Sequence, residues 1–89
     1  MKTYVVIDWS AKIVEALSKD DEAIDKFRDM VFAAKDKNIV TLDEFDMETG
    51  DRNTLLTFSN NKISTADTSM SGIAADMDDE RHALTADNK

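Results

Sequence analysis

The stretch TYVVIDW, residues 3–9, most constrains what this chain can fold into, because it predicts a strand that is apolar on both faces. β-branched and aromatic residues favour strands, and their side chains alternate between the two faces of a sheet. One face therefore carries Tyr4 and Val6, and the other carries Val5, Ile7 and Trp9. A strand of this kind is normally covered on both sides, so the fold needs a covering layer on each.

An amphipathic helix after Ser18 is predicted to form one of these layers. Apolar residues recur there at three- and four-residue spacings over about five turns, namely Ala23, Ile24, Phe27, Met30, Val31 and Ala34. Ser18 and Asp21 have the spacing of a capping box, with Asp in place of the usual Glu. Acids in a first turn also suit the positive end of a helix, so some of the acid has a structural purpose.

A hairpin is predicted from IVTLDEF, residues 39–45, and TLLTFS, residues 54–59. With a five-residue loop at 48–52, Leu42 would face Phe58 and Glu44 would face Leu56. The core face would then hold Val40, Leu42, Leu56 and Phe58. The outer face would hold Thr41, Asp43, Thr57 and Ser59, together with Phe45 and Leu55.

Two segments stay ambiguous at this level. Residues 10–17 fit either a strand that pairs back on 3–9 or a helix, and a strand is favoured because the next segment has its own helix start. The turn WSAK nevertheless lacks the Gly or Asn that tight turns prefer. Residues 63–89 begin as a Ser/Thr-rich linker, and the acidic segment that follows fits either a helix with Ile73, Met77 and Leu84 on one stripe or a disordered tail.

The predicted fold is therefore α+β: a small antiparallel or mixed sheet of three to four strands with one main amphipathic helix on one face. Residues 1–62 are expected to form the single domain, and residues 63–89 a linker and an acidic C-terminal segment that is helical or disordered. The C-terminal segment, a second protomer or a binding partner would cover the other face of strand 3–9.

The residue types needed for common enzyme chemistry are scarce. The chain has no cysteine, one histidine (His82) and two glycines (Gly50 and Gly72), which argues against thiol chemistry and glycine-rich phosphate loops. Asp76, Asp78 and Glu80 have the spacing of a calcium loop but lack its turn glycine. We expect a protein that is not an enzyme and that uses no metal and no cofactor.

The net charge of −8 is concentrated in the second half of the chain. Residues 1–38 carry eight acids and seven bases, whereas residues 39–62 carry five and two and residues 63–89 carry six and two. Direct nucleic-acid binding is disfavoured, because phosphate contacts need clustered Lys and Arg. No apolar stretch has the length of a membrane span, and the absence of cysteine is typical of reducing compartments. We therefore expect a cytoplasmic protein that binds neither nucleic acid nor membrane directly.

The stretch DEFDMETGD, residues 43–51, gathers five of the acids at the predicted hairpin. Glu44, Asp46 and Glu48 would form a row on one strand face, with neighbours about 6.6 Å apart. Ordered carboxylates of this kind can occupy a cationic groove in place of nucleic acid. The predicted partner-binding residues are Asp43, Glu44, Asp46, Glu48 and Asp51, supported by Asp76, Asp78, Asp79 and Glu80.

In its small size, acidity and lack of cysteine, proline and catalytic equipment, the chain is similar to phage-encoded inhibitors of host defence such as anti-CRISPR and anti-restriction proteins. This similarity covers composition only. It implies a non-enzymatic inhibitor that binds a basic surface of a nucleic-acid-handling complex. The alternative hypothesis is a small structural or assembly module that forms a homodimer and carries a merely solvated acidic surface.

Overall fold

A computed structural model describes the backbone of residues 1–87 and the side chains of residues 1–84. The elements in chain order are β1 (Lys2–Asp8), β2 (Ile13–Leu17), α1 (Asp20–Ala33), β3 (Val40–Asp46), β4 (Arg52–Ser59), β5 (Lys62–Ser64), a 3₁₀ turn η1 (Thr68–Met70) and α2 (Ser71–Asp87). The strands form one antiparallel sheet in the order β2-β1-β3-β4-β5. The predicted α+β class is confirmed, whereas the predicted strand count was too low, since the described residues form five strands.

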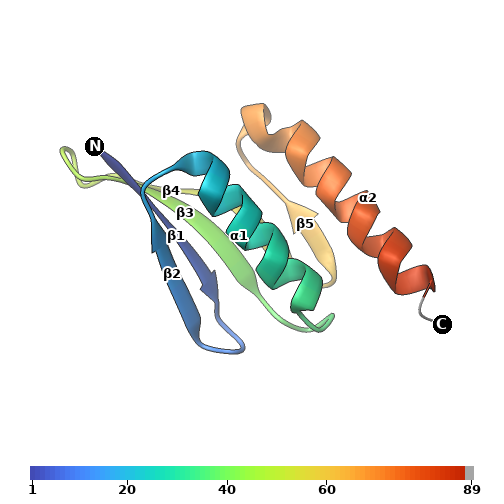
Figure 1. Ribbon diagram of the computed structural model, residues 1–89. Helices are drawn as coiled ribbons and strands as arrows, with labels where there is room; N and C mark the ends of the chain where they lie inside the picture. Colours follow the sequence, from blue (N-terminus) through green and yellow to red (C-terminus); the bar gives the residue numbers. More distant parts are fainter. Residues whose placement is uncertain (88–89) are drawn as a thin grey trace.

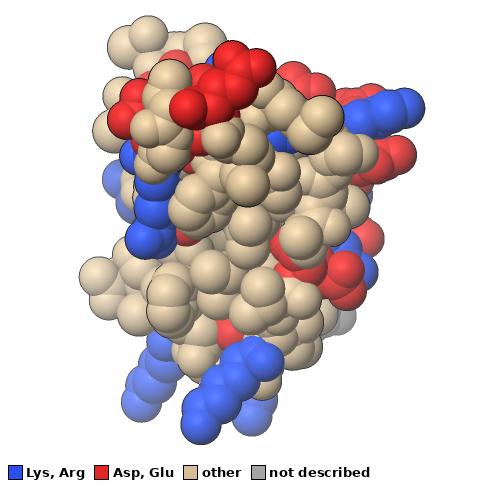
Figure 2. Space-filling view, turned by 90° about the vertical axis from the view of Figure 1, so that its left-hand side faces the viewer, with Lys and Arg blue, Asp and Glu red and all other residues tan. Residues whose placement is uncertain are grey.

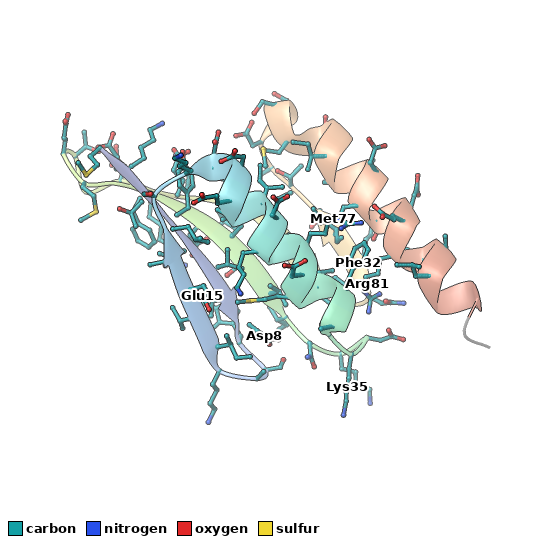
Figure 3. All side chains as sticks on the ribbon, viewed as in Figure 1. Asp8, Glu15, Phe32, Lys35, Met77 and Arg81 are labelled. Carbon is teal, nitrogen blue, oxygen red and sulfur yellow. The ribbon has the colours of Figure 1, made fainter. Side chains whose placement is uncertain are left out.

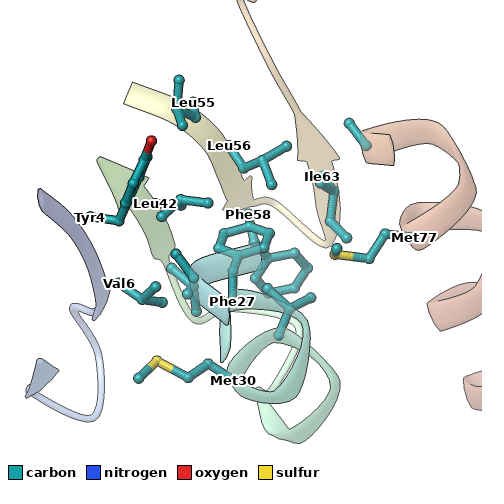
Figure 4. Close-up of a cluster of buried hydrophobic side chains, with 14 residues drawn as sticks. Tyr4, Val6, Phe27, Met30, Leu42, Leu55, Leu56, Phe58, Ile63 and Met77 are labelled. Carbon is teal, nitrogen blue, oxygen red and sulfur yellow. The ribbon is translucent and has the colours of Figure 1, made fainter. Parts of the chain in front are cut away.

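Both helices pack side by side on the same face of the sheet (Figure 1). The predicted helix is confirmed as α1, whose buried face consists of Ala23, Phe27, Met30 and Val31. These side chains meet Val6, Leu42 and Phe58 from the sheet in one core (Figure 4). Phe27 and Phe58 are fully buried at its centre.

The ends of α1 differ from the prediction. The helix has 14 residues and ends at Ala33, and its N-cap is Lys19, which makes no side-chain capping bond. The predicted capping box of Ser18 and Asp21 therefore does not form. The carboxylates of Asp20 and Asp21 instead each accept a hydrogen bond from the next amide along the chain, at 2.8 and 2.9 Å.

The C-terminal segment belongs to the same core. Residues 62–64 form β5, so the predicted boundary after Lys62 falls within a strand and the linker interpretation is wrong there. Residues Asn60 and Asn61 both have positive φ and connect β4 to β5 in a two-residue turn, the geometry that a tight hairpin requires. Of the two predicted states for the following segment, the helix is correct, and α2 buries Ala74 and Met77 against this core. The predicted stripe is wrong in two of its three members, because Ile73 and Leu84 are exposed.

Arg81 fastens α2 to the rest of the fold, and it is buried. Its guanidinium donates to the carbonyl oxygens of Val31 and Ala34 at 3.2 Å each, so it satisfies backbone acceptors at the C-terminal end of α1. It also donates to Asn61 and to Asp36, and it stacks on Phe58 at 4.5 Å from the ring centroid. Figure 3 shows Arg81 reaching from α2 toward α1.

The register of β3 and β4 differs from the predicted one by two residues near the core. Leu42 pairs with Leu56, and Val40 pairs with Phe58. A shift of two keeps every side chain on the same face, so the predicted core set is confirmed, and all four side chains are fully buried. A β-bulge then follows Leu42, and its extra residue, Leu55, joins the core instead of the outer face.

Residues 13–17 form a strand, as the favoured interpretation of that segment predicted. The turn before it takes the left-handed conformation at Lys12, with φ 60°. Lys12 thus adopts the left-handed conformation that Gly or Asn usually adopts in a tight turn. As a result β2 pairs with β1 along its whole length and becomes an edge of the sheet.

The face of the sheet opposite the helices has no cover from the described residues. The register places on it Thr3, Val5, Ile7, Trp9, Val14, Ala16, Thr41, Asp43, Phe45, Arg52, Thr54, Thr57, Ser59, Lys62 and Ser64, which we call the open face. The C-terminal segment was one of the predicted covers for it, but α2 packs beside α1 on the other side (Figure 1). No helix of the described residues therefore covers the second apolar face of β1.

Candidate functional site

Asp43, the first of the predicted binding residues, lies on the open face but is fully buried beneath its neighbours on β4. Its two carboxylate oxygens accept hydrogen bonds from Arg52 at 2.8 Å and from the Thr54 hydroxyl at 2.7 Å. Both partners lie across the bulge on β4, so the cluster stabilises this irregular part of the hairpin. The Asp43 carboxylate is therefore bonded within the fold and is not exposed to a binding partner.

Replacing Asp43 with Ala is expected to lower the free energy of unfolding by about 1–3 kcal/mol, because the Thr54 hydroxyl and the Arg52 guanidinium lose their acceptor. The half-exposed Arg52 side chain can turn to solvent, which keeps the loss moderate. Urea denaturation measures the change. Glu48→Gln in the same hairpin serves as the control, with an expected change within about 0.5 kcal/mol. Equal effects of the two substitutions would contradict a structural role for Asp43.

Glu44 and Asp46 also have partners within the fold. Glu44 forms an ion pair with Lys2 at 3.2 Å, and this contact raises the pKa of the Lys2 ammonium. Asp46 accepts from the amides of Glu48 and Thr49. The Glu48 amide is the main reason that the pKa of Asp46 is lowered, so the turn is stabilised at neutral pH and loses this bond as pH falls through the lowered pKa of Asp46.

Glu48 and Asp51 are the hairpin acids whose side chains face solvent. The Glu48 carboxylate lies 3.4 Å from the N-terminal amine, and both groups are highly exposed, so the pair is weak. In the predicted row, Glu44 and Asp46 therefore have structural partners, and Glu48 alone is exposed enough to contact a binding partner.

The supporting acids on α2 divide in the same way. Asp78 accepts from the amide of Ile63 at 2.9 Å and so ties α2 to β5, and Glu80 pairs with Arg28 of α1. Asp76 and Asp79 point outward and are exposed. Figure 1 shows the hairpin tip and α2 on opposite sides of the molecule, so the fold does not join the two predicted groups into one surface.

A different acidic surface emerges on the outer side of the two helices. The residues Asp21, Glu22, Asp25 and Asp29 lie on the exposed side of α1, and Asp76 and Asp79 lie on the exposed side of α2. We call these six residues the helix-layer acidic surface. Asp21, Asp25 and Asp29 are four residues apart, a rise of about 6 Å per step. Figure 3 shows oxygen-tipped side chains projecting outward along both helices.

The nearby cations on α1 do not neutralise this surface. Lys26 forms an ion pair with Glu15 of β2 at 3.7 Å. Arg28 pairs with Glu80 and lies over the ring of Phe32, 4.5 Å from its centroid. Lys26 is thus paired with an acid of β2 and Arg28 with an acid of α2, and neither is paired with Asp21, Asp25 or Asp29. This row was not predicted from the sequence, although Asp recurs at every fourth position from Asp21 to Asp29.

The described residues form no metal-ligand cluster, since no three carboxylates or imidazoles among them are placed to hold a metal ion. A hollow of about 660 Å³ beside the hairpin is lined in part by Lys2, Glu44 and Arg52, but the ion pairs described above already engage these three charges. No helix within residues 1–87 is both long enough and apolar enough to cross a membrane.

Comparison with known proteins identifies no relative: the chain matches no family model, no curated protein and no solved structure.

Proposed function

We propose that this protein is a non-enzymatic inhibitor that binds a basic site on a nucleic-acid-handling complex and uses carboxylates in place of phosphates. The observation that carries the proposal is the helix-layer acidic surface, where six outward carboxylates lie on two adjacent helices. The nearest cations on α1 are paired with other acids. The proposal moves the principal contact from the hairpin to the helices.

The rigidity of the two helices supports this role. Each helix is anchored by buried side chains on its inner side, with Phe27 in α1 and Met77 in α2. The Arg81 contacts hold α2 against the C-terminal end of α1. The outward carboxylates are thus presented from fixed backbone positions, which reduces the ordering cost when a partner binds.

Phosphate-binding grooves carry clustered Lys and Arg, which attract polyanions from a distance and bind them with a strong dependence on salt. A protein surface with several uncompensated carboxylates is attracted by the same field. Once bound, it excludes nucleic acid from the groove by competition for the same cations. The mechanism needs neither a catalytic residue nor a cofactor.

The test is a pull-down from bacterial lysate with the immobilised protein at low and at high salt. The expected result is capture of a DNA- or RNA-binding protein at low salt, release at high salt, and displacement of that protein from duplex or single-stranded nucleic acid by the free inhibitor. A captured partner that is retained at high salt and still binds its nucleic acid would contradict the proposal.

A further inference from the structure

The open face combines exposed apolar side chains with a charge gradient along the strands. Trp9 is 51% exposed and Val14 is 63% exposed. Val14 on β2 pairs with the partly buried Ile7 of β1, and Trp9 directly follows β1. The Trp9 indole donates to the Thr41 hydroxyl at 2.9 Å, which fixes the ring on this face. A large aromatic side chain held in place at a surface is typical of an interface centre.

Opposite net charges lie at the two ends of this face, since Arg52 at the hairpin end is paired with Asp43. The hairpin tip with Glu48 and Asp51 lies at the Met1 end of β1, where the amide of Met47 donates to the Met1 carbonyl. Lys12 and Lys37 lie in the two loops at the Trp9 end, where the Ile39 amide donates to the Ser10 hydroxyl and brings these loops together. Figure 2 views the molecule from the left-hand side of Figure 1 and shows a broad, mostly uncharged area with acidic side chains above it and basic side chains below it.

From this pattern we infer that the open face binds a second copy of this chain, in a homodimer whose strands run antiparallel across the interface. A two-fold axis that lies in the interface and crosses the strands brings the acidic end of each copy over the lysine end of the other. A two-fold axis along the strands would instead stack acid on acid and lysine on lysine. Charge complementarity therefore selects one of the two symmetric ways to pack identical sheet faces.

The dimer completes the fold in a way that the single chain does not. β1 gains a layer on its second apolar face, as sheet-on-sheet packing provides. Trp9 of each copy comes over the opposite end of the partner's β1. Both helix-layer acidic surfaces stay on the outside of the dimer, so this inference does not depend on the proposed inhibitor function.

The first experiment is sedimentation equilibrium of the wild-type chain and of Val14→Glu. The wild-type chain is expected to dimerise, and Val14→Glu is expected to weaken dimerisation at least tenfold while circular dichroism stays unchanged, since this side chain contacts mainly solvent in the single chain. Asp25→Lys on the helix side is the matched control and should dimerise like the wild type. A wild-type chain that stays monomeric up to about 1 mM would overturn the inference, as would a dimer insensitive to Val14→Glu.

The second experiment tests the antiparallel orientation with two charge-reversed variants. One carries Glu48→Lys and Asp51→Lys, which makes both ends of its open face basic. The other carries Lys12→Glu and Lys37→Glu, which makes both ends acidic. Each variant alone is expected to dimerise at least tenfold more weakly than wild type, and an equimolar mixture is expected to form a heterodimer of about wild-type affinity.

Adding Val14→Glu to either variant should abolish the heterodimer, which separates interface pairing from general attraction between oppositely charged proteins. A mixture that shows no recovery, or recovery that survives Val14→Glu, would overturn the interface. Either variant dimerising alone as tightly as the wild type would overturn the antiparallel arrangement, because only that arrangement places acids over lysines in the wild type.

Discussion

Phe27→Ala is expected to remove about 3–5 kcal/mol from the free energy of unfolding. Phe27 is fully buried where α1 meets the sheet, so truncation removes ring contacts with both layers and leaves a cavity that a small core cannot close. A domain of this size has little stability to spare, so the variant should be largely unfolded at physiological temperature. Urea denaturation followed by circular dichroism measures the loss.

Asp25→Ala, two residues earlier on the exposed side of the same helix, is the matched control. It tests helix propensity and charge without touching the core, and the expected change is within about 0.5 kcal/mol. A loss below about 1 kcal/mol for Phe27→Ala, comparable to that of a surface substitution, would contradict the packing of α1 on the sheet.

Arg81→Ala is expected to destabilise the protein by about 3 kcal/mol, because two carbonyls at the end of α1 lose a charged donor and hydrogen bonds to charged groups contribute about 1.5–3 kcal/mol each. The lost stacking on Phe58 adds to this. Hydrogen exchange should show the largest loss of protection in α2 and β5, the elements that Arg81 joins to α1.

Asp79→Ala on the outward side of α2 is the control, and its exchange pattern should match that of the wild type. If Arg81→Ala changed neither stability nor exchange, the C-terminal segment would be the separable tail that the sequence also allowed.

The core residues were predictable because they follow the hydrophobic periodicity of helices and strands, which does not depend on the exact strand register. Phe27, Met30 and Val31 follow the helical repeat, and Leu42 and Phe58 follow strand alternation. The β3–β4 register was wrong by two residues, but a shift of two returns each side chain to the same face. The bulge was not predictable from strand alternation, because it inserts one extra residue into β4 and so moves Leu55 to the core face. It also brings Arg52 and Thr54 over Asp43, which is buried beneath them.

The missed strand β5 had a weak local signal. Asn60 and Asn61 are residues that tolerate the left-handed conformation, and the pair predicts a two-residue hairpin turn. The three-residue strand that follows is too short for an alternation pattern. The sequence did not indicate that Arg81 is buried, because a single Arg in an acidic helix is normally exposed. Its role depends on the carbonyl groups of Val31 and Ala34, which only the tertiary structure brings to it.

The density of acidic residues along the sequence did not indicate which carboxylates are exposed and unpaired in the fold. The hairpin has the densest cluster, yet Asp43, Glu44 and Asp46 are engaged in a buried cluster, an ion pair and a turn. The more open carboxylates of α1 are spread over nine residues and balanced in sequence by neighbouring bases. Only the side-by-side packing of the helices shows that those bases point elsewhere.

The most direct test of the proposed function compares the partner affinity of two neutralised variants. One replaces Asp21, Asp25, Asp29, Asp76 and Asp79 with Asn and Glu22 with Gln, and the other replaces Glu48 and Asp51 with Gln and Asn. Because close charge pairs across an interface couple by about 1.5–7 kcal/mol each, the helix-layer variant is predicted to lose binding by at least a hundredfold while keeping its fold. The hairpin variant should bind within a few fold of the wild type. Binding that survives loss of the helix-layer charges would contradict the account.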